Sequence, residues 1–326
     1  MKILVTDDDP VILELLTQFL TGVGKHEIST AGSAAEAIAL LAADDTSDFD
    51  CFLIDMVMPG MDGIALTRHI RQTDAYRLAP VIMLTVMTEK TFVDQAFEAG
   101  ATDYITKPFE LGALASRIAM VEKLVTGRQA ADQIILADGV LLNGAQPREP
   151  VELGDAFALH NLPNVIAHTA MQNYVAHLSR SALFGATVFG FSLRKAEVYC
   201  DTLTGADFKF MIEDVAKSLS ETLQEHPILL TYAGNGTFVC IVESGWRPDM
   251  AQLCDRVNVT LSQSRIISNT GAPLHPRLSA GAAIRLVWKS GNQIVNALTK
   301  AQVTAEHAAQ EYERLKTDFF HIRRSA

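Results

Sequence analysis

The stretch that decides the fold is CFLIDMVMPGMDG, residues 51–63. Its first four residues form an unbroken apolar run, which is typical of a strand buried on both faces of a parallel sheet. The run ends at Asp55, and Pro59-Gly60 together with Asp62-Gly63 predict a loop directly after it. Because open α/β sheets bind their ligands at the carboxyl ends of their strands, Asp55 is the first candidate functional residue.

Strand and helix patterns alternate on both sides of this stretch. We expect strands at residues 2–6, 26–31, 51–55, 80–85 and 103–106. We expect helices at residues 10–20 with Asp9 as the N-cap, 33–43 with a Ser33/Glu36 capping box, 63–72, 90–99 and 110–125. Five strand–helix repeats predict a doubly wound α/β domain over residues 1–125, with a five-stranded parallel sheet between two layers of helices.

Polar residues follow the expected strands of this domain. They are Asp7, Asp8 and Asp9 after the first strand, Asp55 at the third, Thr85 at the fourth and Lys107 after the fifth. The carboxyl ends of parallel strands share one edge of the sheet, so these side chains should converge. Clustered carboxylates repel one another unless a cation neutralises them, and Mg²⁺ prefers such oxygen ligands. With the metal bound, Asp55 could act as a nucleophile toward a phosphoryl group, whose oxygens Lys107 and Thr85 would stabilise.

Residues 1–125 resemble the receiver domain of two-component response regulators. The resemblance is carried by Asp7-Asp8, by Asp55 in LIDMVMPGMDG, by Thr85 and by Lys107-Pro108-Phe109. It implies that Asp55 is the phospho-acceptor and that Asp8 and Asp55 ligate Mg²⁺. It also implies that Asp7 reaches the ion through water and that the backbone carbonyl of Val57 completes the protein ligands.

The same resemblance implies a switch and a partner. Thr85 and Tyr104 occupy the positions of the switch hydroxyl and the switch aromatic, although a plain packing role for Tyr104 is an equal alternative. The partner would be a sensor histidine kinase or a phosphotransfer protein.

Length, charge and cysteine content set the broad class. A chain of 326 residues predicts about two domains. The net charge of −11 is concentrated in residues 1–125, which hold 19 acidic and 9 basic residues, and the absence of a large basic face argues against direct nucleic-acid binding. The sequence contains no apolar run of membrane-spanning length, and its four scattered cysteines suit a reducing compartment. We expect a cytoplasmic protein without membrane insertion.

The second half of the chain has a different pattern. Residues 126–155 predict a linker, in which a continuing helix or a small hairpin is left open, and residues 156–326 predict an α+β domain with a mainly antiparallel sheet. Its expected elements are helices at 165–181, 208–223, 250–263 and 292–319, and strands at 186–193, 229–232, 238–243 and 278–287. Gly234-Asn235-Gly236 lies between two of these strands, and a hairpin turn is favoured over a phosphate-binding loop.

This second domain resembles the GGDEF domains of diguanylate cyclases. Leu162-Pro163-Asn164 matches the leading turn of that family, and residues 234–238 occupy its signature. The family's metal-binding, base-reading and phosphate-contacting positions correspond here to Ser192, Gly236, Thr237, Cys200, Lys209 and Ala309. Residues 225–228, Glu-His-Pro-Ile, stand where the family has its inhibitory motif. Without metal-binding carboxylates the condensation of two GTP molecules is not expected.

These patterns predict a response regulator of a two-component phosphorelay that is not an enzyme beyond its own phosphoryl transfer. It would signal through a degenerate, catalytically inactive GGDEF-like domain, by contact with a downstream protein or by forming a homodimer. Two alternatives stay open: a sensor that binds GTP or cyclic di-GMP without turnover and, less favoured, an active diguanylate cyclase.

Overall fold

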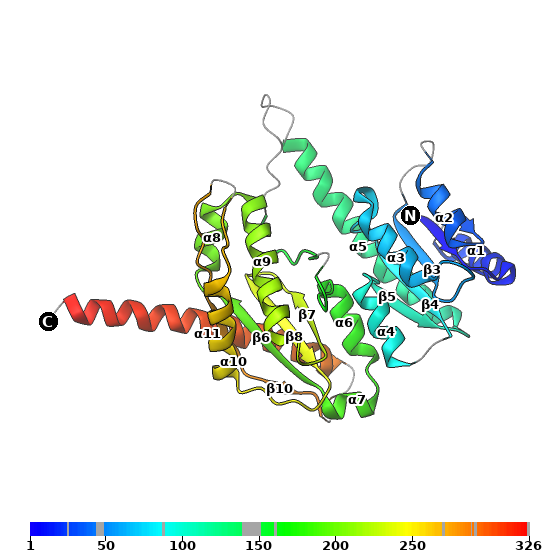
Figure 1. The fold of residues 1–326 in the computed structure, drawn as a ribbon. Helices are drawn as coiled ribbons and strands as arrows, with labels where there is room; N and C mark the ends of the chain where they lie inside the picture. The colour runs from blue at the N-terminus through cyan, green and yellow to red at the C-terminus, as the bar shows by residue number, and fades with distance from the viewer. Residues whose placement is uncertain are drawn as a thin grey trace. The chain divides into compact units, whose positions relative to one another are not determined.

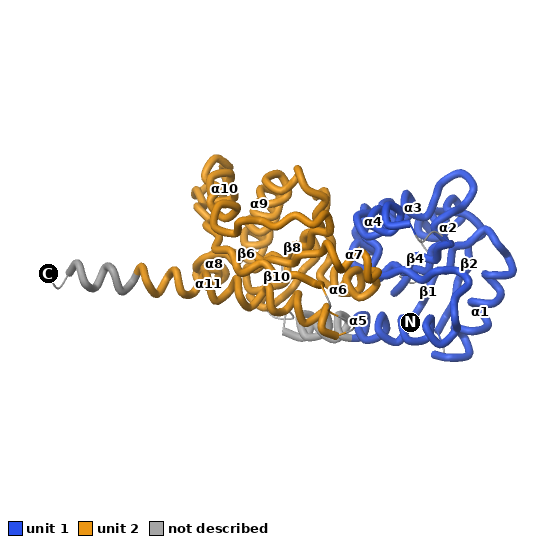
Figure 2. The backbone as a smooth tube through the Cα atoms, turned by 90° about the horizontal axis from the view of Figure 1, so that it is seen from below, with its two compact units in different colours: residues 1–143 blue, residues 144–326 orange. Residues whose placement is uncertain are grey.

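The computed structural model describes residues 1–24, 26–43, 49–86, 89–138, 151–159, 162–268, 271–287, 289 and 292–324. For residues 127–138 and 317–324 it describes the helical backbone alone. The chain forms two compact units, residues 1–143 and residues 144–326 (Figure 2). Among the described residues, no helix has both the length and the apolar run that crossing a bilayer requires.

The first unit alternates strands and helices (Figure 1). Its described elements are β1 (Lys2–Thr6), α1 (Pro10–Gly24), β2 (Glu27–Ala31), α2 (Ala34–Leu41), β3 (Cys51–Asp55), α3 (Gly63–Gln72), the short 3₁₀ helix η1 (Asp74–Tyr76), β4 (Val81–Thr85), α4 (Lys90–Glu98), β5 (Asp103–Thr106) and α5 (Leu111–Asp138). The strands form one parallel sheet in the order β2-β1-β3-β4-β5. The predicted doubly wound domain is confirmed.

Apolar side chains cover both faces of this sheet, because alternate strand residues point to opposite sides. On one face Leu4, Phe52 and Met83 pack with residues of α2, α3 and α4. On the other face Val5 and Leu53 pack with residues of α1 and α5. All five residues of β3 are buried, as its unbroken apolar run predicts.

Local signals explain where several helices begin. The Ser33 hydroxyl accepts a hydrogen bond from the Glu36 amide at 3.2 Å, and the Glu36 carboxylate accepts one from the Gly32 amide at 2.7 Å. Asp62 caps α3 by accepting from the Ala65 amide at 2.7 Å. The bonds to Ser33 and Asp62 satisfy amides that the first turn of a helix leaves without a partner, and the bond to Glu36 satisfies the amide just before the N-cap.

The end of α5 lies beyond the expected helix 110–125 and agrees with the alternative of a helix that continues into the linker. The helix continues to Asp138 instead of ending near Val125, so the first part of the predicted linker is helical. Residues 126–138 contain no proline and a single glycine, Gly127, and most of the others favour a helix. Residues 139–150, the middle of the predicted linker, lie outside the described residues.

The second unit contains α6 (His168–His177), α7 (Arg180–Gly185), β6 (Thr187–Leu193), α8 (Ala196–Thr202), α9 (Gly205–Leu223), β7 (Ile228–Tyr232), β8 (Thr237–Val242), α10 (Met250–Gln263), β9 (Leu278–Ala280), β10 (Ile284–Arg285) and α11 (Asn292–Arg324). The described strands pair antiparallel in the order β10-β6-β8-β7, and β9 also pairs with β6. The predicted antiparallel sheet is therefore present.

Three elements of this unit differ from the prediction. The helical run expected at 165–181 is two helices, because Leu178 adopts an extended-type conformation and Ser179 caps α7. The single strand expected at 278–287 is two short strands separated at Gly281, where a Cβ atom would lie 2.6 Å from the backbone nitrogen of Ala305. The seven-residue helix α8 has no counterpart in the prediction, since it is too short for a periodic pattern.

The two faces of this sheet are covered by different helices. Phe189, Phe191 and Leu193 of β6 belong to the core that includes residues of α9 and α10. The intervening residue Gly190 faces α11, and a Cβ atom there would lie 2.8 Å from the carbonyl oxygen of Ala301. Glycine at this position allows α11 to lie directly against β6.

The outer edge of β7 is partly covered by the segment that precedes α6. Val165 forms an isolated parallel bridge with Leu230. The Leu230 amide donates to the Asn164 carbonyl at 2.7 Å, and the Ile166 amide donates to the Leu230 carbonyl at 2.9 Å. The turn at Leu162-Pro163-Asn164 therefore leads the chain along an edge strand.

Candidate phosphoryl-acceptor site

The sheet order brings the predicted acids together. Because β1 lies beside β3, the residues that follow β1 come next to Asp55 although they are far from it in the sequence. Asp7, Asp8 and Asp55 each offer one carboxylate oxygen, and these three oxygens lie within 4.8 Å of one another. The cluster lies at the carboxyl ends of the strands, where the strand order reverses between β1 and β3.

Lys107 joins two of these acids. Its Nζ atom is 2.6 Å from Asp7 Oδ2 and 2.5 Å from Asp55 Oδ1. Its backbone amide donates to the Thr85 carbonyl at 2.6 Å, which fixes the residue after β5 beside the end of β4. Asp7 is fully buried and Asp55 is 5% exposed, so the ammonium neutralises charge that water cannot reach freely.

Backbone amides bind the other oxygens of the two buried acids. Asp7 Oδ1 accepts from the Asp9 amide at 3.1 Å, and Asp55 Oδ2 accepts from the Val57 amide at 3.0 Å. Burial raises the pKa of Asp55, and the hydrogen bond to Lys107 only partly offsets that rise. Burial acts to lower the pKa of Lys107, but the hydrogen bonds to Asp55 and Asp7 outweigh it and raise the pKa. Lys107 is therefore charged at neutral pH.

The donor set suits a hard divalent cation. It consists of carboxylate oxygens from two buried acids and from Asp8, whose side chain is exposed and gives solvent access to the cluster. Val57 is half exposed and its amide binds Asp55. The ligand role of the Val57 carbonyl stays a prediction.

The two predicted switch residues have different surroundings. Thr85 is fully buried at the end of β4, and its hydroxyl donates to Met56 Sδ at 3.3 Å. Tyr104 is half-buried in β5, and its ring meets that of Phe97 edge to face at 6.1 Å between centroids. Burial raises the pKa of the Tyr104 hydroxyl. A switch role for either residue stays a prediction.

Met56 is a neighbour of the site that the sequence-based reasoning missed. Its amide donates to the Leu84 carbonyl at 2.8 Å, which extends the pairing of β3 with β4 by one residue and brings its sulfur to Thr85. The expected parallel pairing of these two strands is the signal that could have identified it.

Two of the predicted positions of the second unit, Ser192 and Thr237, lie together, whereas Cys200 donates to the Val151 carbonyl and Lys209 lies near the Phe157 ring. The Thr237 hydroxyl donates to Ser192 Oγ at 3.0 Å, and Glu306 Oε1 accepts from Asn235 Nδ2 at 3.2 Å and from Gln302 Nε2 at 3.0 Å. Ala309 is buried in α11. Within the described part of this unit, no group of three His, Cys, Asp or Glu side chains converges as the acids of the first unit do.

Comparisons with known proteins match the first unit. Residues 3–119 match the family model of the response regulator receiver domain. The transcriptional regulatory protein KdpE of Staphylococcus aureus is 34% identical over 141 residues, which are 43% of this chain and 57% of KdpE. ResD of Bacillus subtilis is 43% identical over 108 residues, which are 33% of this chain and 42% of ResD. The chain spans about half the length of the curated relatives it matches.

The solved structures that are similar to part of this chain include the chemotaxis protein CheY4 of Vibrio cholerae. The two sequences are 30% identical, and the match covers 37% of this chain and 97% of the CheY4 chain, with a TM-score of 0.34. The family match, together with the acidic cluster at the switch point of its sheet, defines the first unit as an α/β receiver domain. More specifically, it is the receiver domain of a two-component response regulator.

Proposed function

We propose that this protein accepts a phosphoryl group on Asp55 from a sensor histidine kinase or a phosphotransfer protein. The observation that carries the proposal is the convergence of three carboxylates with Lys107, whose ammonium lies within 2.6 Å of both buried acids. Such a site combines a nucleophile with a fixed positive charge for the transferred oxygens.

The residues of the chain have distinct roles in this transfer. One oxygen of Asp55 bonds to the phosphorus as the bond from phosphorus to the donor imidazole nitrogen breaks, and that nitrogen keeps the electron pair. Lys107 stabilises the charge on the transferred oxygens. The Thr85 hydroxyl rotates away from Met56 and donates a hydrogen bond to one of these oxygens. Asp7, Asp8, Asp55 and the Val57 carbonyl would hold Mg²⁺, which would supply further charge neutralisation.

The second unit would transmit the signal without catalysis. The positions that the GGDEF resemblance assigns to metal ligands hold Ser192, Gly236 and Thr237. The two hydroxyls bind each other, and the nearby Glu306 already accepts bonds from neighbouring side chains. A site that condenses two nucleoside triphosphates needs metal ions to polarise the phosphates. We therefore favour output by contact with a downstream protein or by homodimer formation.

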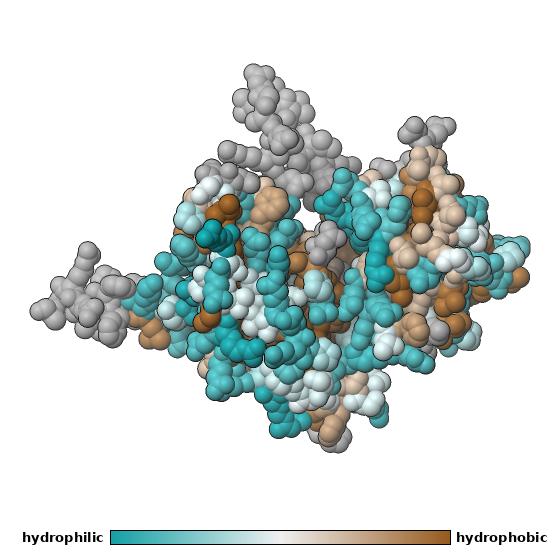
Figure 3. Space-filling view, viewed as in Figure 1, coloured by the Kyte–Doolittle hydropathy of each residue, from teal (hydrophilic) through white to brown (hydrophobic). Residues whose placement is uncertain are grey.

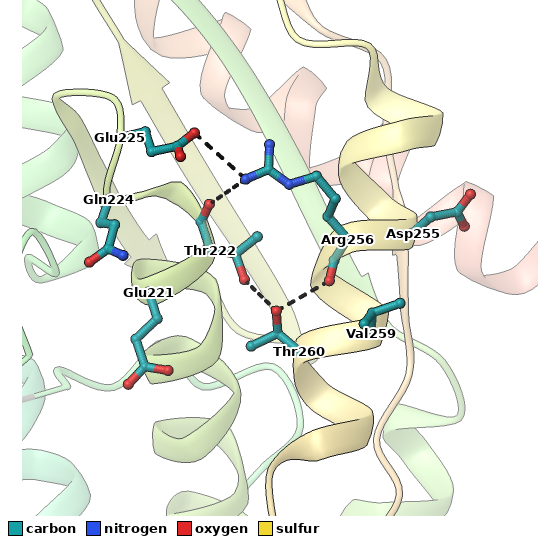
Figure 4. Close-up of a pocket in the computed structure, with 8 residues that line it drawn as sticks. All are labelled: Glu221, Thr222, Gln224, Glu225, Asp255, Arg256, Val259 and Thr260. Atoms are coloured by element: carbon teal, nitrogen blue, oxygen red, sulfur yellow. Dashed lines mark hydrogen bonds and ion pairs between the residues drawn. The ribbon is translucent and has the colours of Figure 1, made fainter.

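A groove in the second unit has a lining that does not favour the binding of a nucleotide there. It has a volume of about 440 Å³, lies between α9 and α10, and includes Glu221, Glu225 and Asp255 (Figure 4). Its one arginine, Arg256, reaches across to Glu225 Oε2 at 3.8 Å and to the Thr222 carbonyl at 3.4 Å. The surrounding surface of α9 and α10 is mostly hydrophilic (Figure 3). The arginine is already paired with Glu225, whereas Glu221 and Asp255 point away from it (Figure 4), so among the lining residues no unpaired basic side chain is offered to an anionic nucleotide.

The test is phosphoryl transfer to the full chain. With a radiolabelled phosphohistidine donor and Mg²⁺, we expect an acid-stable, base-labile label that is lost in Asp55→Asn. Asp62→Asn is the matched control, because Asp62 caps α3 outside the cluster and asparagine is also a good cap. Labelling of Asp55→Asn at the wild-type rate would refute the acceptor assignment. Light scattering with and without beryllofluoride and Mg²⁺ then tests whether the subunits assemble or separate.

A further inference from the structure

The last helix of the second unit, α11, continues past the sheet that it covers. It packs on β6 through small side chains, since a Cβ atom added to Gly190 would lie 2.8 Å from the Ala301 carbonyl oxygen and 3.2 Å from the Ala305 Cβ atom. Its later described turns, up to Lys316, extend away from the other elements of the same unit (Figures 1 and 2). From position 312 to Arg324 the helix rises ~20 Å.

Two contacts mark the point at which α11 leaves its unit. The Arg194 guanidinium lies over the Tyr312 ring, 3.5 Å from the ring centroid. In the next residue of the helix, Glu313 Oε2 lies 4.0 Å from Lys195 Nζ. Tyr312 is still 44% exposed, and Leu315, almost one turn further on, is 57% exposed. The helix therefore carries large apolar side chains into solvent beyond its last contacts with the unit.

These exposed side chains belong to a regular apolar stripe. Its members lie alternately three and four residues apart and are Ala305, Ala308, Tyr312, Leu315, Phe319 and Ile322. Ala305 is fully buried against the unit, whereas for the last two residues the structure describes the helical backbone alone. This spacing is the heptad pattern of helices that pack side by side, with the stripe at the a and d positions.

Charged residues flank the projecting part of the stripe in a fixed order. With Tyr312 at a and Leu315 at d, the exposed Glu311 is at g and the exposed Lys316 is at e. Asp318 and Arg323 repeat this order, acid at g and base at e, one heptad later in the sequence. In a parallel pair of helices a g residue lies beside the following e residue of the partner helix, so each acid would meet a base. In an antiparallel pair g meets g and e meets e, so like charges would meet.

We propose that the projecting end of α11 is a dimerisation surface, which pairs in parallel with the same helix of a second copy of this chain. The order of the charges identifies the occupant, because in parallel orientation the helix is complementary to itself. Pairing would remove Leu315 and the open side of the Tyr312 ring from water. An isolated helix of this length is marginal in water, but this one continues a helix that is already fixed on β6.

This inference rests on the proposed output by homodimer formation and names the surface that forms the dimer. About two heptads give a weak dimer, so the equilibrium should depend on protein concentration in the accessible range.

The test is sedimentation equilibrium of the full chain over a range of concentrations, with and without beryllofluoride and Mg²⁺. Leu315→Asp places a carboxylate in the seam between the helices and should raise the dimer dissociation constant at least about tenfold. Val303→Asp is the matched control, because Val303 is 54% exposed on the same helix but lies at an f position, outside the stripe. It should leave the dissociation constant unchanged. Circular dichroism confirms that each variant is folded.

Two charge variants test the parallel pairing. Glu311→Lys and Lys316→Glu each bring like charges together across the seam, so each variant alone should dimerise more weakly than the wild type. An equimolar mixture should recover the dimer. In the mixed dimer the introduced lysine faces the introduced glutamate, and Glu311 of one chain faces Lys316 of the other. Mixing would not rescue two chains that had simply misfolded.

A cysteine variant tests the orientation directly. In a Cys200→Ser background the remaining native cysteines, Cys51, Cys240 and Cys254, are buried. Mild oxidation of Leu315→Cys in this background should join two copies through position 315, because equal d positions face each other in a parallel pair. Val303→Cys should not form this link.

Four results would overturn the proposal. The first is a chain that stays monomeric up to about 1 mM, with and without beryllofluoride. The second is equal weakening of the dimer by Leu315→Asp and Val303→Asp, and the third is a mixture of charge variants that recovers no dimer. The fourth is a monomer that binds anionic lipid vesicles through Leu315, which would identify a membrane surface as the occupant. Labelling of Asp55 is measured separately, so loss of the acceptor assignment and loss of this dimer surface are distinguishable.

Discussion

Removal of the Lys107 ammonium should weaken the first unit and increase its dependence on divalent cations. In Lys107→Met a side chain of similar length remains, but the charge within 2.6 Å of Asp7 and Asp55 is lost. Two buried carboxylates and the adjacent Asp8 would then face one another without compensation. Their repulsion favours any condition that supplies a cation or unfolds the unit.

The structure sets the size of this effect. Removing one partner of a buried ion pair typically costs about 3–5 kcal/mol. The Lys107 side chain is 16% exposed, so some solvent screening applies, and the lower end of that range, about 3 kcal/mol, is expected for the free energy of unfolding without metal. With Mg²⁺ the difference should shrink, since the metal replaces the lost charge. The variant should also bind Mg²⁺ about tenfold more tightly, because no ammonium repels the ion.

The assay is urea unfolding in chelator and in millimolar Mg²⁺. Both tryptophans, Trp246 and Trp288, belong to the second unit, so their fluorescence follows that unit while circular dichroism follows both. Lys107→Met should shift only the unfolding transition of the first unit, which circular dichroism detects and tryptophan fluorescence does not. Lys123→Met, at an exposed position of α5, is the matched control and should change stability by less than about 0.5 kcal/mol. Equal stability of Lys107→Met and wild type in chelator, or equal stabilisation of both by Mg²⁺, would refute the reasoning.

Three other substitutions test the packing within the two units. The Arg71 guanidinium donates to three backbone carbonyls in the first unit, so Arg71→Lys, which cannot make the same fork of bonds, should lower its stability by about 2 kcal/mol in urea unfolding. His26 is 4% exposed, and burial lowers its pKa, so the folded unit resists a proton that the unfolded chain accepts below pH 6.5. Stability should therefore fall as the pH drops through and below 6.5, and His26→Gln should reduce that slope; an unchanged slope would contradict the assignment. Gly190→Ala places a Cβ atom 2.8 Å from the Ala301 carbonyl and should destabilise the second unit by about 1–3 kcal/mol, seen as an earlier tryptophan transition. An unshifted transition would mean that α11 moves away at little cost.

The first unit could be predicted well from its sequence because its signals agree. The apolar run before Asp55 defines a buried strand, and the rules for strand connections bring Asp7 and Lys107 to the same edge. These rules do not predict the distances between individual side-chain atoms. The bridging of two acids by Lys107 depends on side-chain conformation, and the contact between Thr85 and Met56 depends on the pairing of β3 with β4.

The second unit was harder to predict for physical reasons. Short elements such as α8 leave no periodic pattern, and the division of the strand near Gly281 depends on the close passage of α11. The continuation of α5 through residues 126–138 reflects helix propensity without a strong apolar stripe. The packing of residues 151–159 against the core of the unit could not be foreseen, because a segment without helix or strand resembles a linker in the sequence.

The turn at Leu162-Pro163-Asn164 has a consequence for behaviour at high protein concentration. The edge of β7 would otherwise offer free amides and carbonyls to a strand from another molecule. The Leu230 amide already donates to the Asn164 carbonyl, and the Leu230 carbonyl already accepts from the Ile166 amide. Pro163 has no backbone amide hydrogen to offer to another strand. Loss of this cover should therefore expose the edge of β7 and promote strand-to-strand association between molecules.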